Sequence, residues 1–120
     1  MSVTAQTFET TSGEGDNTRI HYVMMSGGRK LGEGDCVIDG RLTAEDIETI
    51  RTFLAANGGF RPDEAGVPDL IERMPLSWTP AGDEVHTITK ISYTNSRPTA
   101  GSLDAAQFAY CFEELQASRS

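Results

Sequence analysis

Alternating hydrophobic and polar residues predict a β-strand in one segment of the chain, and residue types that favour a sheet predict a strand in another. The first segment covers residues 18–25. Its Ile20, Tyr22 and Met24 fall on one face, as in a strand that packs one side against a core. The second segment, residues 85–94, is rich in threonine and isoleucine and contains a tyrosine, which suits a sheet better than a helix.

Two further strands are expected near the start of the chain. The threonine-rich segment 4–11 precedes a dense turn signal over residues 12–17, so we expect a hairpin into the strand at 18–25. After a glycine turn at 26–28, a third strand with two internal glycines runs to Ile38. The expected arrangement is an antiparallel meander.

Apolar residues spaced three and four apart predict a helix that begins after the N-cap residue Thr43. Ile47, Ile50 and Leu54 form its apolar stripe. Residues 57–59, Asn-Gly-Gly, end it.

A second helix is expected after Ser102-Leu103-Asp104 at the end of the chain. Phe108, Cys111, Phe112 and Leu115 lie on one stripe, which we expect to be buried in the core.

The connection between the first helix and the last strand shows no sustained period. Residues 60–82 carry four of the five prolines, so we expect an ordered irregular segment with one helical turn after Pro68. The element order β-β-β-α-loop-β-α predicts a single α+β domain over residues 1–120. Its antiparallel sheet of about four strands would carry two helices packed on one face.

Charge adds a functional indication. The net charge is −8, and residues 31–72 hold ten acids against three bases. This balance disfavours direct binding to nucleic acid or to an anionic membrane surface, and a protein partner with a basic surface is the natural complement. The alternative is that the acids form a solvated face that only maintains solubility. We expect no membrane span and, because a leader-like start is lacking, a cytoplasmic location.

Six residues of the acidic region are the predicted binding residues. Two lie on the first predicted helix, and four lie in a segment that two prolines stiffen, which lowers the entropy cost of presenting a defined surface. They are Glu45, Glu48, Arg61, Asp63, Glu64 and Asp69.

Metal and cofactor sites are not expected. Residues 35–46 resemble an EF-hand or dockerin-type calcium loop, with Asp35, a central glycine and Asp46, but Val37 replaces an oxygen ligand and no helix precedes the loop. The glycines of residues 27–34 match no phosphate-binding motif. Cys36 and Cys111 are expected to be free thiols, without a zinc site.

The function expected is therefore that of a non-catalytic protein-binding module, such as an inhibitor, an immunity-type protein or a regulatory adaptor. It would recognise a basic surface, in a stronger version by imitating the charge of nucleic acid. One alternative is a small enzyme in which Glu84 and His86, on one face of a strand, form an acid-base pair beside Trp78. Another is a structural subunit of a homo-oligomer.

Overall fold

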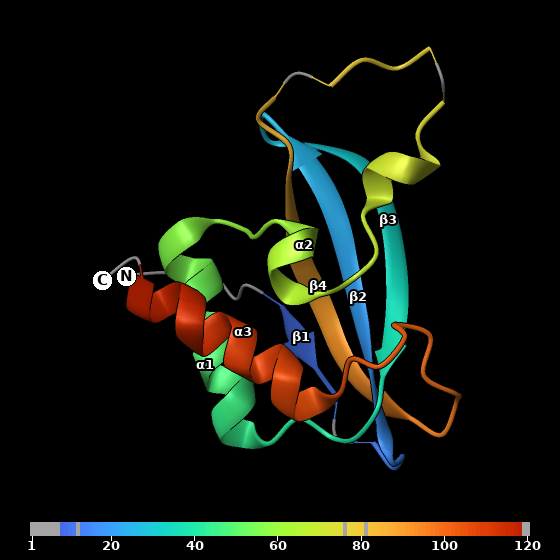
Figure 1. Ribbon diagram of the computed structural model, residues 1–120, viewed down its shortest axis with the longest axis vertical. Coiled ribbons are helices and arrows are strands. Elements are labelled where there is room, and N and C mark those ends of the chain that lie inside the picture. The colour runs from blue at the N-terminus through green and yellow to red at the C-terminus, as the bar shows by residue number, and fades with distance from the viewer. Residues whose placement is uncertain (1–7, 12, 76, 81, 119–120) are drawn as a thin grey trace.

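The protein is an α+β domain with one four-stranded sheet (Figure 1). The strands are β1 (Glu9–Thr10), β2 (Asn17–Ser26), β3 (Arg29–Ile38) and β4 (Val85–Thr94), in the spatial order β1-β4-β2-β3. The computed structural model describes residues 8–11, 13–75, 77–80 and 82–118.

The sheet is mixed, and this corrects the expected antiparallel meander. β2 pairs antiparallel with β3 and with β4, whereas β1 pairs parallel with β4. The hairpin expected between β1 and β2 is therefore wrong, because β4 lies between them. The part of the predicted first strand at residues 4–7 lies outside the described residues.

The segment before β2, which carries the turn signal, passes across the end of β4. Gly15 approaches β4 so closely that a Cβ on it would lie 2.3 Å from the Thr94 nitrogen. Its φ of 154° is also one that residues with a side chain rarely adopt. Glycine at this point therefore lets the chain pass over β4 before it enters β2.

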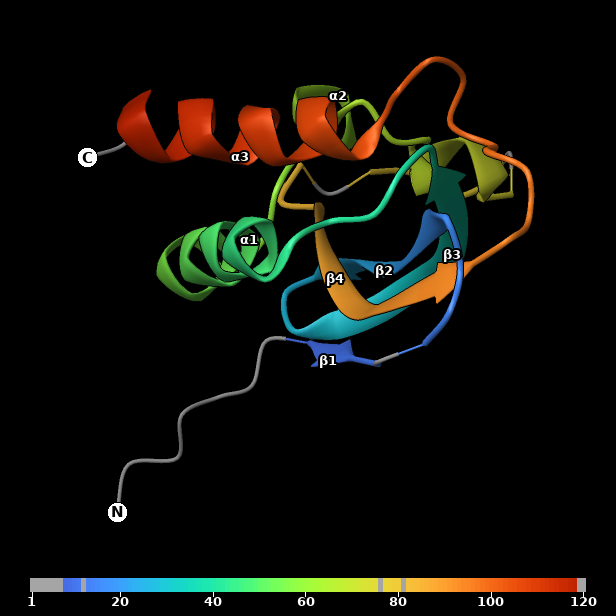
Figure 2. The same cartoon turned by 90° about the horizontal axis from the view of Figure 1, so that it is seen from below.

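The helices lie on one side of the sheet (Figure 2). They are α1 (Ala44–Asn57), the single turn α2 (Pro62–Ala65), the 3₁₀ turn η1 (Leu70–Arg73) and α3 (Ala105–Ser118). α3 lies beside α2 (Figures 1 and 2), and the Ala105 N–H at its start donates to the Asp39 carbonyl just after β3 at 2.7 Å. Among the described residues, no helix has the length and apolar character needed to cross a membrane.

Local sequence signals place the ends of α1 as expected. The Thr43 hydroxyl accepts a hydrogen bond from the Asp46 N–H at 3.0 Å, and the Asp46 carboxylate accepts one from the Thr43 N–H at 3.1 Å. This capping box satisfies two backbone donors at the start of the helix. Gly58 ends the helix with φ 77°, a conformation that glycine adopts without strain.

Four phenylalanines join the two long helices and the segment between α1 and α2. Phe112 on α3 packs edge-to-face against Phe53, Phe60 and Phe108, with centroid distances of 5.2–5.5 Å. All four side chains are buried. The expected core stripe of α3 is thus confirmed for Phe108 and Phe112, whereas the other two members, Cys111 and Leu115, are only partly buried.

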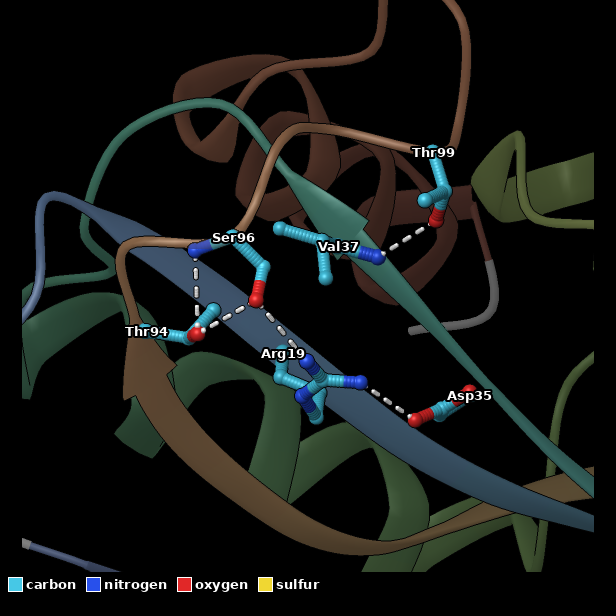
Figure 3. A network of polar contacts seen from close by, with 6 residues as sticks. All are labelled: Arg19, Asp35, Val37, Thr94, Ser96 and Thr99. Atoms are coloured by element: carbon cyan, nitrogen blue, oxygen red, sulfur yellow. Dashed lines mark hydrogen bonds and ion pairs between the residues drawn. The ribbon is translucent and has the colours of Figure 1, made fainter.

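The connection from β4 to α3 pairs with the outer edge of β3 at Val37. Val37 donates its N–H to the Thr99 hydroxyl at 2.9 Å and accepts the Thr99 N–H at 2.8 Å. Nearby, the Arg19 side chain on β2 donates hydrogen bonds to the Asp35 carboxylate at 2.7 Å and to the Ser96 hydroxyl at 3.2 Å (Figure 3). These contacts fix the path of the chain from the sheet to α3.

Replacement of Phe112 tests the role of the phenylalanine cluster. Phe112→Ala leaves a cavity against three aromatic rings, so the free energy of unfolding is expected to fall by about 3–5 kcal/mol. Tyr110→Ala, two residues away on the same helix but exposed, is expected to change it by less than about 0.5 kcal/mol. Urea denaturation of both variants measures the difference, and equal effects would contradict a core role for α3.

Candidate binding site

A polar cavity of about 380 Å³ lies at the start of β4. Two segments that are remote in the sequence form it: residues 61–71, which include α2 and the start of η1, and residues 82–86, which lead into β4. We call it the β4 pocket. Its lining includes Arg61, Asp63, Asp69, Ile71, Glu84 and His86.

Backbone pairing with β4 brings the first of these segments to the sheet. The Phe60 N–H donates to the His86 carbonyl at 2.8 Å, and the His86 N–H donates to the Phe60 carbonyl at 2.9 Å. Gly59 permits this approach, since a Cβ on it would lie 2.8 Å from the His86 oxygen. The two glycines after α1 thus have separate tasks: Gly58 ends the helix, and Gly59 allows the contact with β4.

Local chemistry shapes the rest of the segment. Pro62 starts α2 at a position where no N–H is needed, and Gly66 ends the turn with φ 78°. Asp69 then caps η1, because its carboxylate accepts the Ile71 N–H at 2.9 Å. The helical turn expected after Pro68 is therefore confirmed, while α2 went unpredicted because one turn is too short to show a period.

His86 holds η1 against the sheet through its side chain. The residue is 1% exposed, and its Nε2 accepts a hydrogen bond from the Leu70 N–H at 3.1 Å. An imidazole nitrogen that accepts a backbone N–H carries no proton of its own, so the proton of the neutral ring resides on Nδ1. Nδ1 is buried and has no hydrogen-bond partner among the residues that the structure describes.

Burial lowers the pKa of His86, and the nearby carboxylate of Asp69 opposes this shift only in part. Asp69 Oδ1 lies 3.5 Å from His86 Nε2. That contact would become an ion pair only if the ring were protonated, and protonation would end the bond from Leu70. The hydrogen bond from Leu70 in this structure therefore requires the neutral imidazole.

Three of the six predicted binding residues meet in the β4 pocket. Arg61 and Asp63 form an exposed ion pair with an Nε–Oδ1 distance of 3.6 Å, and Asp69 lies on the wall with His86. Sequence patterns gave no sign that Glu84 joins these residues, because the contact depends on the pairing between Phe60 and β4.

The other three predicted residues lie elsewhere. Glu45 and Glu48, on α1, line a separate hollow of about 290 Å³ with Thr49 and Thr52. The Glu64 carboxylate accepts the Arg61 N–H at 3.1 Å and lines a hollow beside α3. The six residues thus occupy more than one surface.

The acid-base pair of Glu84 and His86 remains a prediction. Both residues line the β4 pocket, as expected for neighbours on one face of a strand. However, Nε2 of His86 is engaged by Leu70, and the Glu84 carboxylate accepts the Gly82 N–H at 3.1 Å. For Nε2 to act as a general base, the bond that holds η1 would have to break.

The calcium-like segment at residues 35–46 has its two end carboxylates in structural roles. Asp35 pairs with Arg19, and Asp46 completes the capping box of α1. No three His, Cys, Asp or Glu side chains among the described residues gather in a way that could hold a metal ion. Cys36 is a buried free thiol, and burial raises its pKa to about 12.

Comparison with protein-family models, curated protein sequences and solved structures finds no match for this chain.

The hydrogen bond from Leu70 to His86 predicts a pH-dependent stability. The pKa of His86 in the folded state lies below its ordinary value of 6.5. The unfolded chain therefore binds more protons, and the free energy of unfolding falls as the pH drops below 6.5 towards the folded-state pKa. His21 adds a similar contribution, since burial lowers its pKa as well.

Urea denaturation between about pH 8 and pH 5 measures this effect, because the window spans the ordinary pKa of histidine. His86→Phe is expected to reduce the pH dependence and, by leaving the buried Leu70 N–H without an acceptor, to lower stability at pH 8 by about 1–3 kcal/mol. His21→Gln serves as the control and should keep the part of the slope that belongs to His86. An unchanged slope in His86→Phe would contradict the role assigned to the imidazole.

Proposed function

We propose that the protein is a non-catalytic binding module that holds a basic side chain of a protein partner in the β4 pocket. One observation carries the proposal: carboxylates from distant parts of the sequence, Asp63, Asp69 and Glu84, line one cavity in which Arg61 is the only lysine or arginine among the described residues. A lysine or arginine side chain supplies the charge that such a cavity lacks.

The size of the pocket suits this ligand. A volume of about 380 Å³ lies at the lower end of the range for small-ligand sites, so the pocket accommodates one long side chain rather than a folded surface. The Arg61–Asp63 pair contributes little free energy because both side chains are more than 70% exposed. A partner cation can therefore replace Arg61 beside Asp63 at small cost.

The charge around the pocket supports the same partner class. The net charge of −8 steers a basic protein towards the molecule over long range, while the pocket fixes the position of one side chain at short range. Glu45 and Glu48 on α1 add to the long-range attraction, and their membership of the same interface stays a prediction.

A lysine-rich peptide is the simplest probe of this function. In isothermal titration at low salt, Asp63→Asn combined with Asp69→Asn is expected to weaken binding about tenfold, or about 1.4 kcal/mol. Asparagine at position 69 can still cap η1, so the fold should persist. Added salt is expected to weaken the binding of the unaltered protein as well, because it screens the attraction.

The matched control is Glu14→Gln combined with Glu33→Gln, which removes the same charge from exposed acids outside the pocket. It should change the affinity by less than about twofold, because screened charges that touch no ligand contribute little. Equal losses in the two double variants would contradict recognition by the pocket and leave only diffuse attraction. A third variant, Glu45→Gln with Glu48→Gln, tests whether α1 takes part.

A further inference from the structure

The outward face of α3 carries an exposed aromatic side chain. Tyr110 is 58% exposed and is the single large hydrophobic residue that is exposed among the described residues. Glu114 lies one helical turn further on, and its carboxylate raises the pKa of Tyr110. A tyrosine side chain offers a large contact area and loses little conformational entropy on binding.

Two hollows meet at Tyr110 and its neighbour Cys111. One, of about 400 Å³, extends towards Leu103, Ala100 and Gly66. The other, of about 390 Å³, extends along the helix towards Leu115.

We call the two hollows together the α3 groove. Its walls come from α3, from the connection before α3 and from the neighbourhood of α2, which lies beside α3 (Figures 1 and 2). An aromatic ridge between two hollows with apolar walls is the arrangement expected at the centre of a protein-binding surface.

The rim of the α3 groove is acidic. Glu64 and Glu114 line the second hollow, and Glu113 is exposed next to Glu114. The sequence of α3 contains no lysine or arginine. This charge disfavours a second copy of the chain as occupant, because the α3 helix of that copy would bring no lysine or arginine to meet the glutamates.

We infer that the α3 groove docks an amphipathic, basic helical segment of a partner protein. Apolar side chains of that segment enter the two hollows on either side of Tyr110, and its lysines or arginines meet Glu64, Glu113 and Glu114. The groove is distinct from the β4 pocket, since none of the residues that line it lines that pocket. α2 separates them: Asp63 faces the pocket, while Glu64 faces the groove.

Two peptides of equal charge separate this surface from the pocket. One is a helical peptide of leucine and lysine with all its leucines on one face, and the other is a lysine-rich peptide without leucine. The amphipathic peptide should bind more tightly, and Tyr110→Ala should weaken it about tenfold while leaving the lysine-rich peptide unaffected. Tyr110→Phe keeps the ring and should retain most of the affinity.

Alkylation of Cys111 shows directly where the amphipathic peptide binds. It is partly exposed within the groove, whereas Cys36 is buried, so iodoacetamide should alkylate Cys111 alone in the folded protein. The amphipathic peptide is expected to slow this reaction severalfold, and the lysine-rich peptide is not.

The outcomes distinguish the two proposals. If Tyr110→Ala binds the amphipathic peptide as tightly as the unaltered protein does, or if Cys111 is not protected, the α3 groove is not the docking surface. The affinity of the Asp63→Asn/Asp69→Asn variant for the lysine-rich peptide tests the β4 pocket and not the α3 groove. Concentration-dependent dimerisation on a sizing column that Tyr110→Ala abolishes would show that a second copy occupies the groove and would overturn the inference.

Discussion

The hydrogen bond from the Leu70 N–H to the buried imidazole of His86 fixes how the middle of the chain meets the sheet. Through its backbone the same residue pairs with Phe60, so one position of β4 holds both ends of the segment that contains α2. The Tyr22 hydroxyl adds a third attachment by donating to the Pro68 carbonyl at 2.7 Å. The β4 pocket exists because these bonds hold an otherwise irregular segment in one place.

The two candidate surfaces share α2 as their dividing wall. This single turn is anchored on one side by its own backbone bonds and on the other by contact with α3. The pocket on one side is lined mainly by polar groups, whereas the groove on the α3 side combines apolar walls with an acidic rim. A partner that covered both would combine a charged contact, which favours fast association, with apolar burial, which slows dissociation.

Local patterns predicted the elements but not their neighbours. The β-favouring residues of segment 85–94 and the cap at Thr43 are local signals, and β4 and α1 lie where these signals place them. The insertion of β4 between β1 and β2 joins strands that are remote in the sequence, and the close approach of Gly15 to Thr94 that accompanies it has no period to detect. Three pocket residues were predicted from charge and proline content, while their meeting with Glu84 required the long-range pairing of Phe60 with His86.

β3 forms one edge of the sheet, and the connection before α3 closes that edge only at its Val37 end. Along the remainder, residues 29–35, no other described segment forms a backbone hydrogen bond with this outer edge. Charges of both signs stand along it, at Arg29, Lys30, Glu33 and Asp35. An incoming strand would have to strip water from these charged groups, which makes edge-to-edge pairing unfavourable. The charged residues of β3 therefore oppose fibril growth by strand addition at this edge, where no described segment of the fold covers the strand.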